Sequence, residues 1–487
     1  MIEHLPVLAV AVSLLGSFTV VLTSLYTRKA GYPLSLSVTF IQLVMAVAIL
    51  MNINSGGAIS YWLGGWRPPW GIEYRVDILG AYVLVIVTLF SFLATVYARK
   101  TVEKEIDPEK QPYFYTLWLL LVSGMAGVAV TGDLFNLFVF LEIASLATYA
   151  LIAMAGKRAL IASFNYLVLG AVGISFYLLG TAFLYAATGT LNMLDARALL
   201  TLIYDSRIVQ LSFVFYFIGL AMKMALFPFH VWQPNAYEHS PSAVTVIIST
   251  ALAKVNAYAL FRLIFSVYTV KFFQNYGTIF ELTAIVASAG IIAGSVLAIM
   301  ERSLKKMLAY SSVANVGYIV LSFTLGKWGV YAAAAHLLNH SLMKAALFMV
   351  AGGFIYRLGI RRIDELEGLG RAMPLSSAAF AMAAVSMIGI PPSAGFVTKL
   401  FILLASLDTG RFVFIAVMIA SSLLSLVYFW RVIEILYMKG HRERMDELPA
   451  SMLYPALIMG VLSILAGILW FFSIDILDEI VIALGVV

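Results

Sequence analysis

Four lysines lie deep inside apolar segments of this chain, and two of them accompany prolines in the middle of such a segment. Lys223 precedes Pro228, and Lys399 follows the pair Pro391 and Pro392. An ionisable group at membrane depth costs at least about 2.5 kcal/mol and is by default a functional candidate. Arginine keeps its proton in proteins, and we assign none to these depths, whereas a buried lysine can release its proton. The pattern predicts a route for protons across a membrane.

The other two lysines extend this pattern. Lys254 lies in mid-segment, too far from either interface to reach water comfortably. Lys344 follows His336 and His340 at intervals of four residues, so the three side chains share one face of a helix over a rise of roughly 12 Å. Two histidines at this spacing can share a zinc ion, but no carboxylate or cysteine accompanies them in the segment, which favours proton relay over metal binding. A packing role for either histidine is the alternative.

Glu142 is the predicted partner of the first lysine. If Asp133 caps the start of a helix, Glu142 lies about nine residues further on, roughly 13 Å into the membrane and near its midplane. A carboxylate there needs a cation, and Lys223 stands beside a break in the same group of helices, so we expect the two side chains to be close. His230, beside Trp232, is a weaker candidate, because it either transfers protons or only satisfies the backbone at the break.

Composition places these residues in a polytopic membrane protein. The chain is 62% hydrophobic and 11% charged, against roughly 25% charged residues in soluble domains. It contains no cysteine, so it cannot supply the thiolates that usually hold iron–sulfur clusters. No nucleotide-binding motif is present, and the net charge of +6 is spread over loops, which argues against nucleic acid. We therefore expect no cofactor, no metal and no redox or hydrolytic site in this chain, and any electrons would travel in another subunit.

The elements that position the lysines are helices. On the rule of roughly 17–25 apolar residues per span, we predict an all-α protein with about fourteen spans. Prolines break the seventh and the twelfth, and broken backbone at this depth must be buried in protein or line a wet cavity. Since the broken spans are five apart, they predict two inverted five-helix repeats, spans 4–8 and 9–13. The predicted units are the first three spans in residues 1–114, the repeats in 115–265 and 276–437, and the fourteenth span in 450–487.

Basic residues predict the orientation in the membrane. With loops assigned alternately, about eighteen Lys and Arg, among them Lys305, fall on one side, and about eight, among them Arg197 and Arg262, fall on the other. Loops rich in Lys and Arg face the cytoplasm, so both termini are predicted to lie outside the cell membrane.

Several stretches of the chain carry these residues in a specific context. They are Thr131–Glu142, Met222-Lys223 followed by Leu226-Phe227-Pro228, Ala253-Lys254-Val255, His340–Phe348, and Gly389–Phe396 with Lys399. Together they resemble the antiporter-like subunits shared by respiratory complex I, membrane-bound hydrogenases and the multi-subunit Mrp cation/proton antiporters. Length and the stretch Gly64–Gly71 are most similar to the D-type chain of the Mrp antiporters, whereas Phe229–Pro234 is more similar to the complex I relatives.

The resemblance implies a pair of half-channels. Lys223, paired with Glu142, would receive protons from the cytoplasm by way of Lys254. The protons would then leave outside after passing His336, His340, Lys344 and Lys399. The resemblance also implies other membrane subunits as partners, together with either a peripheral redox module that holds iron–sulfur clusters or an exchange of protons for Na⁺.

Four alternatives stay open at this point. Within the resemblance, the chain is either a proton pump module driven by a redox partner or the proton-conducting part of a sodium/proton antiporter. A structural subunit that docks partners and conducts nothing would not need four costly lysines at depth. A transporter of organic solutes would need a cavity with mixed recognition groups, whereas this chain presents a line of titratable ones.

Overall fold

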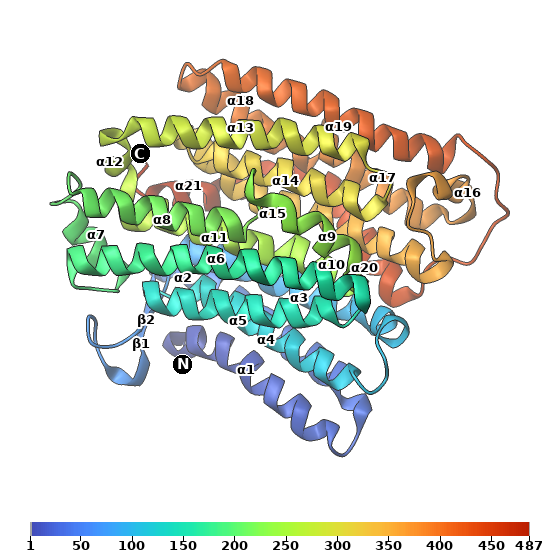
Figure 1. Cartoon of the computed structure of the whole chain (residues 1–487), viewed down its shortest axis with the longest axis horizontal. Coiled ribbons are helices and arrows are strands. Elements are labelled where there is room, and N and C mark those ends of the chain that lie inside the picture. The colour runs from blue at the N-terminus through green and yellow to red at the C-terminus, as the bar shows by residue number, and fades with distance from the viewer. Residues whose placement is uncertain (1, 487) are drawn as a thin grey trace.

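The computed structural model describes residues 2–486, which form a bundle of helices whose axes lie roughly parallel to one another (Figure 1). Both termini, a β-hairpin and the short helices α7 and α12 lie at one end of the bundle, which we call the terminal face. The short helix α16 lies at the other end, which we call the opposite face. The predicted all-α polytopic fold is confirmed.

The N-terminal part and the first predicted repeat contain the hairpin and the first broken span. The N-terminal part consists of α1 (Leu5–Ser24), α2 (Gly31–Gly56), the antiparallel strands β1 (Ile59–Trp62) and β2 (Glu73–Val76), and α3 (Ile78–Glu105). Then follow α4 (Gln111–Val130), α5 (Leu134–Ala153), α6 (Lys157–Thr188), α7 (Met193–Leu200), α8 (Arg207–Lys223) and α9 (Trp232–His239). The eighth span is one long helix that consists of α10 (Ser242–Ile247), a π-helical turn (Ile248–Leu252), α11 (Ala253–Arg262), a second π-helical turn (Leu263–Tyr268) and α12 (Thr269–Asn275).

The C-terminal part contains the second broken span. Its helices are α13 (Gly277–Met300), α14 (Leu304–Ser322), α15 (Gly326–Leu358), α16 (Leu369–Ala372), α17 (Pro374–Ile388), α18 (Ala394–Asp408), α19 (Val413–Tyr437), α20 (Ala450–Ile468) and α21 (Ile474–Ala483). The helix α21 returns along the terminal face after α20 and packs against α15 and α3.

Within residues 2–486, eleven helices are long and apolar enough to cross a membrane. The other three of the roughly fourteen predicted spans are each interrupted or polar. The seventh is divided into α8 and α9, the twelfth is divided into α17 and α18, and α14 carries Lys305, Lys306 and several serines. The two breaks lie at the predicted prolines, at residues 224–231 and 389–393. The inverted relation between the two groups of five spans stays a prediction.

Two side chains fix where helices begin near the terminal face. Asp133 caps α5, as predicted, because its carboxylate accepts the backbone N–H of Asn136 at 2.7 Å. Asp77 caps α3 in the same way by accepting the N–H of Gly80 at 2.9 Å. Burial raises the pKa of the Asp133 carboxyl, although hydrogen bonds from the backbone oppose this.

The eighth span lies in the middle of the bundle. Its most apolar stretch is wholly buried, whereas less than half of the corresponding stretch is buried in α1, α2, α6, α13 and α19. A helix enclosed on all sides cannot present a lysine to lipid headgroups. Lys254 on this span is therefore held inside protein, at 1% exposure.

Candidate functional site

The polar series begins where α5 and α8 meet. The Lys223 ammonium, 1% exposed, donates to Glu142 Oε1 at 2.6 Å and to Ser145 Oγ at 2.8 Å. Ser145 lies almost one turn after Glu142 on α5, so both acceptors point to the same lysine. The predicted proximity of Glu142 and Lys223 is confirmed. Ser145 was not identified from the sequence, although its place three residues after a buried glutamate is the signal that could have found it.

The break after Lys223 leaves main-chain carbonyls without their helical partners, and two side chains donate hydrogen bonds to them. The indole N–H of Trp232 donates to the Met222 carbonyl at 3.0 Å, and the Asn256 amide donates to the Lys223 carbonyl at 3.0 Å. The second bond connects the break to α11. The ring of His230 lies against Phe227, with centroids 5.4 Å apart, and near Tyr310. The break therefore brings Asn256 to Lys223, whereas His230 packs among aromatic rings.

Lys254 follows a π-helical turn that the sequence did not reveal. A π-turn widens the helix by one residue and leaves carbonyl groups without their regular partners, and such turns are frequent at functional sites. The ammonium of Lys254 donates to one of these carbonyls, that of Ser249. The next carbonyl, of Thr250, accepts the hydroxyl of Ser341 on α15 at 2.7 Å. The π-turn thus places a lysine and connects α11 to the helix that carries the histidines.

His336, His340 and Lys344 share one face of α15, as their spacing predicts. The two imidazole rings are parallel, with an interplanar angle of 5° and centroids 5.2 Å apart. His336 Nδ1 lies 3.2 Å from the hydroxyl of Thr398, whereas both ring nitrogens of His340 lack a protein partner among residues 2–486. The Lys344 ammonium turns toward α14, where it donates to the Leu308 carbonyl at 2.6 Å.

The series ends at the second break. Lys399 lies in α18 and turns back toward the break, where its ammonium donates to the Ile388 carbonyl at 2.5 Å. Gly389, with φ of +86°, makes room for this, since a Cβ there would lie 2.7 Å from the lysine side chain. Asn339 of α15 joins the same corner by donating to the Ala394 carbonyl at 2.9 Å. The side chain does not extend along the helix toward the interface, so snorkelling is not its role in this conformation.

The acceptors divide the four lysines into two kinds. In residues 2–486, Lys223 has a carboxylate within 4 Å, whereas the other three donate to neutral oxygens. A carboxylate stabilises the ammonium form far more than a carbonyl does. Lys223 therefore differs from the other three lysines in having a charged partner. No group of three His, Cys, Asp or Glu side chains that could hold a metal ion occurs in the described residues.

Two basic residues that the sequence analysis assigned to loops are buried in helices. Lys305 lies in the first turn of α14 at 4% exposure and donates to the Ser240 carbonyl at 3.1 Å. Arg262 closes α11 at 6% exposure, so the expectation that no arginine lies within the spans is wrong. The apolar pattern could not reveal this, because Asp77, far away in the sequence, supplies the counter-charge.

Comparisons with known proteins agree with this geometry. Residues 131–425 match the family model described as NADH:quinone oxidoreductase/Mrp antiporter, TM. The chain is 42% identical to NADH-quinone oxidoreductase subunit N of Desulforudis audaxviator over 96% of both chains, and 28% identical to the D-type chain of the Na⁺/H⁺ antiporter of Alkalihalophilus pseudofirmus over 90% of both. A chain in the structure of the membrane-bound sulfane sulfur reductase, an archaeal respiratory membrane complex, superposes with a TM-score of 0.91 at 31% identity, covering 99% of this chain and 97% of that one. The chain therefore belongs to the NADH:quinone oxidoreductase/Mrp antiporter family and is an antiporter-like membrane subunit.

Proposed function

We propose that this chain moves protons across the cell membrane as one subunit of a multi-subunit complex. The observation that carries the proposal is the ion pair of buried Lys223 with half-buried Glu142, because its ammonium can pass a proton on and its carboxylate favours the return of one. The remaining lysines are connected to this pair through shared contacts. Asn256 and Lys254 lie on α11, Thr250 contacts Ser341 of α15, and Thr398 beside Lys399 contacts His336.

Uptake from the opposite face is supported by a cavity of about 590 Å³ that opens there. Its lining includes Glu105, Glu238, His239 and Lys305, all of which can bind or release protons. Lys305 also donates to Thr245 at 3.1 Å, two residues before the end of α10 and the π-turn that precedes Lys254. Protons would pass from this cavity to Lys254 and Lys223, then along His336, His340 and Lys344 to Lys399.

The same proposal includes the orientation. The loops that are rich in Lys and Arg lie at the opposite face, so the positive-inside rule assigns that face to the cytoplasm and the terminal face with both termini to the outside. Because the chain has no cysteine, single cysteines can test this. A cysteine in place of Arg207 at the terminal face should react with an impermeant external reagent, and a cysteine in place of Arg361 should be protected. The reverse labelling pattern would invert the direction of transport.

The exposed part of Glu142, in its ion pair with Lys223, supports contact with a neighbouring subunit. Glu142 keeps 23% of its side chain exposed on the outer surface of α5, between Phe135 and Leu146, which are also exposed. A carboxylate that faces lipid at this depth is costly. A second membrane subunit that covers this surface of α5 would remove the cost. Whether the complex is driven by a redox module with iron–sulfur clusters or exchanges protons for Na⁺ decides which other partners it has.

The function is tested in inverted vesicles that contain the assembled complex, energised either by an electron donor or by a Na⁺ gradient. We expect one of the two to drive proton movement, and Lys344→Ala to abolish it while the complex still assembles, because Lys344 is fully buried and donates only to neutral acceptors. Lys100→Ala, at an exposed surface pair with Glu103, is the control. A structural subunit would instead leave proton movement unchanged in the Lys344 variant.

A further inference from the structure

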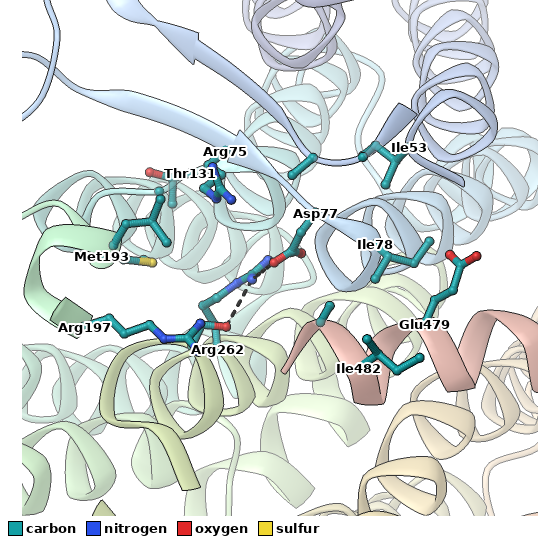
Figure 2. Close-up of a pocket in the computed structure, with 16 residues that line it drawn as sticks. Ile53, Arg75, Asp77, Ile78, Thr131, Met193, Arg197, Arg262, Glu479 and Ile482 are labelled. Atoms are coloured by element: carbon teal, nitrogen blue, oxygen red, sulfur yellow. Dashed lines mark hydrogen bonds and ion pairs between the residues drawn. The ribbon is translucent and has the colours of Figure 1, made fainter. Parts of the chain in front are cut away.

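A second cavity opens at the terminal face and has no place in the proton path described above. Its volume is about 400 Å³, and it is enclosed by the hairpin, the start of α3, α7, the second π-turn of the eighth span and α21 (Figure 2). Three arginines line it, Arg75, Arg197 and Arg262, against the two acids Asp77 and Glu479. Arg75 and Arg197 are half-buried, whereas Arg262 is buried.

Arg262 is held by several hydrogen bonds and by an ion pair with Asp77. Its guanidinium donates to both oxygens of Asp77, with a distance of 2.7 Å from Nη2 to Oδ1, to the Tyr258 hydroxyl from Nε at 3.1 Å and from Nη2 at 2.7 Å, and to Ser266 at 3.2 Å. All five N–H groups of the side chain are thus used. Figure 2 shows Asp77 and Arg262 pointing toward one another at the wall of the cavity.

The neighbouring backbone is shaped to admit this group. A Cβ on Gly80 would lie 3.0 Å from Arg262 Nη2 and 2.9 Å from the Ala129 carbonyl. Glycine at this position of α3 therefore lets the guanidinium approach the helix. Burial alone would raise the pKa of the Asp77 carboxyl, but the adjacent Arg262 overrides it and holds the pKa below its usual range. Asp77 is therefore ionised at neutral pH and anchors Arg262 there.

Arg262 stands between the cavity and the proton path. Lys254, Tyr258 and Arg262 follow one another at intervals of four residues within α11, so they lie on one face of that helix. The rise from Lys254 to Arg262 is roughly 12 Å. Between these two residues, the Tyr258 hydroxyl donates to the Ala129 carbonyl of α4 at 3.1 Å. A proton that moved from the cavity to Lys254 would have to pass the guanidinium and then the phenol.

We propose that Arg262, fixed by Asp77 and Tyr258, is a barrier that prevents protons from moving between the terminal-face cavity and Lys254. An arginine cannot release its proton, so it cannot serve as a relay, and Asp77, Tyr258 and Ser266 take up all five of its N–H groups. The inference rests on the proposed function, because without the barrier protons would return to Lys254 and dissipate the gradient that the subunit helps to build.

The test measures passive proton inflow, without any energy source, in sealed vesicles whose terminal face points outward. An acid pulse is applied outside and a dye reports the internal pH. We expect Asp77→Asn combined with Arg262→Gln, which removes both charges and keeps hydrogen-bonding groups, to raise the inflow rate several-fold over the unmodified complex. Adding Lys254→Ala should return the rate to the unmodified level. Arg197→Gln, at the same cavity but away from α11, is the control and should not leak.

Two results would overturn the barrier. One is unmodified inflow in the double variant, which lacks the fixed guanidinium and its carboxylate partner. The other is a leak that persists after Lys254→Ala, because it would then pass elsewhere. Failure of the proposed function would be seen separately, as unchanged energised transport in the Lys344 variant, since the passive assay requires no turnover.

Discussion

Replacing Lys223 with arginine is expected to lower energised proton transport by about tenfold or more while the complex still assembles, because arginine keeps the charge but cannot release the proton. The ion pair with Glu142 and the hydrogen bond to Ser145 can both be retained by a guanidinium, so the packing of α5 on α8 is preserved. Proton uptake into inverted vesicles measures the first effect, and a native gel measures assembly.

The matched control is Lys100→Arg, the same change at an exposed surface pair, for which we expect normal transport. Near-normal transport in the Lys223 variant would remove this residue from the carriers and leave it a structural cation. Arg262 makes the contrast sharper. Where the chain needs a fixed charge beside Asp77 it uses arginine, and where we propose that protons move it uses lysine.

The candidate site could be predicted from the sequence as far as residue type and helix position determine it. A charged residue in an apolar segment is conspicuous, so Glu142 and the four lysines were identified from the sequence, and helical spacing aligned His336 with His340. The breaks were predicted because proline has a local effect on the backbone. The contact of Glu142 with Lys223 followed from the cost of an unpaired carboxylate at depth.

What could not be predicted depends on contacts between distant segments. The π-turn at Ile248–Leu252 contains no proline or glycine, so its sequence does not predict the free carbonyl to which Lys254 donates. Arg262 was assigned to a loop because its counter-charge, Asp77, lies in another part of the chain. Lys305 was counted as a loop cation because it stands at the start of a polar helix, although it is buried there.

The fold, like the site, could be predicted only where the pattern is local in the sequence. Apolar length located the long spans, and prolines located the two divided ones, whose parts have 17 and 8 residues in α8 and α9 and 15 residues each in α17 and α18. The helix α21 was not separated from α20 in the sequence, because both are apolar and only a short turn of residues 469–473 divides them. The lining of the terminal-face cavity by α21 was therefore not foreseen.

Replacing Glu142 with glutamine is expected to reduce energised proton transport severely, while Glu142→Asp reduces it less. Lys223 has one carboxylate partner within 4 Å in the described residues, and glutamine would leave its ammonium with neutral acceptors only, like those of the other three lysines. The ammonium form would then be populated less, so Lys223 would hold a proton too rarely between transfers. Aspartate keeps the charge but is one methylene shorter, so it weakens the pair without removing it.

The order of the two variants distinguishes a proton-holding pair from a structural one. If the pair served stability alone, removing one partner would destabilise the fold and impair assembly. The destabilisation is about 3–5 kcal/mol for a fully buried pair and is smaller here, because Glu142 is partly exposed. We expect instead that the complex with Glu142→Gln assembles and fails in transport, and that Glu103→Gln at the surface pair changes neither. Full transport in the Glu142→Gln complex would contradict the role of this pair as a proton-holding site, since the lysine would then work without the charge that stabilises its proton.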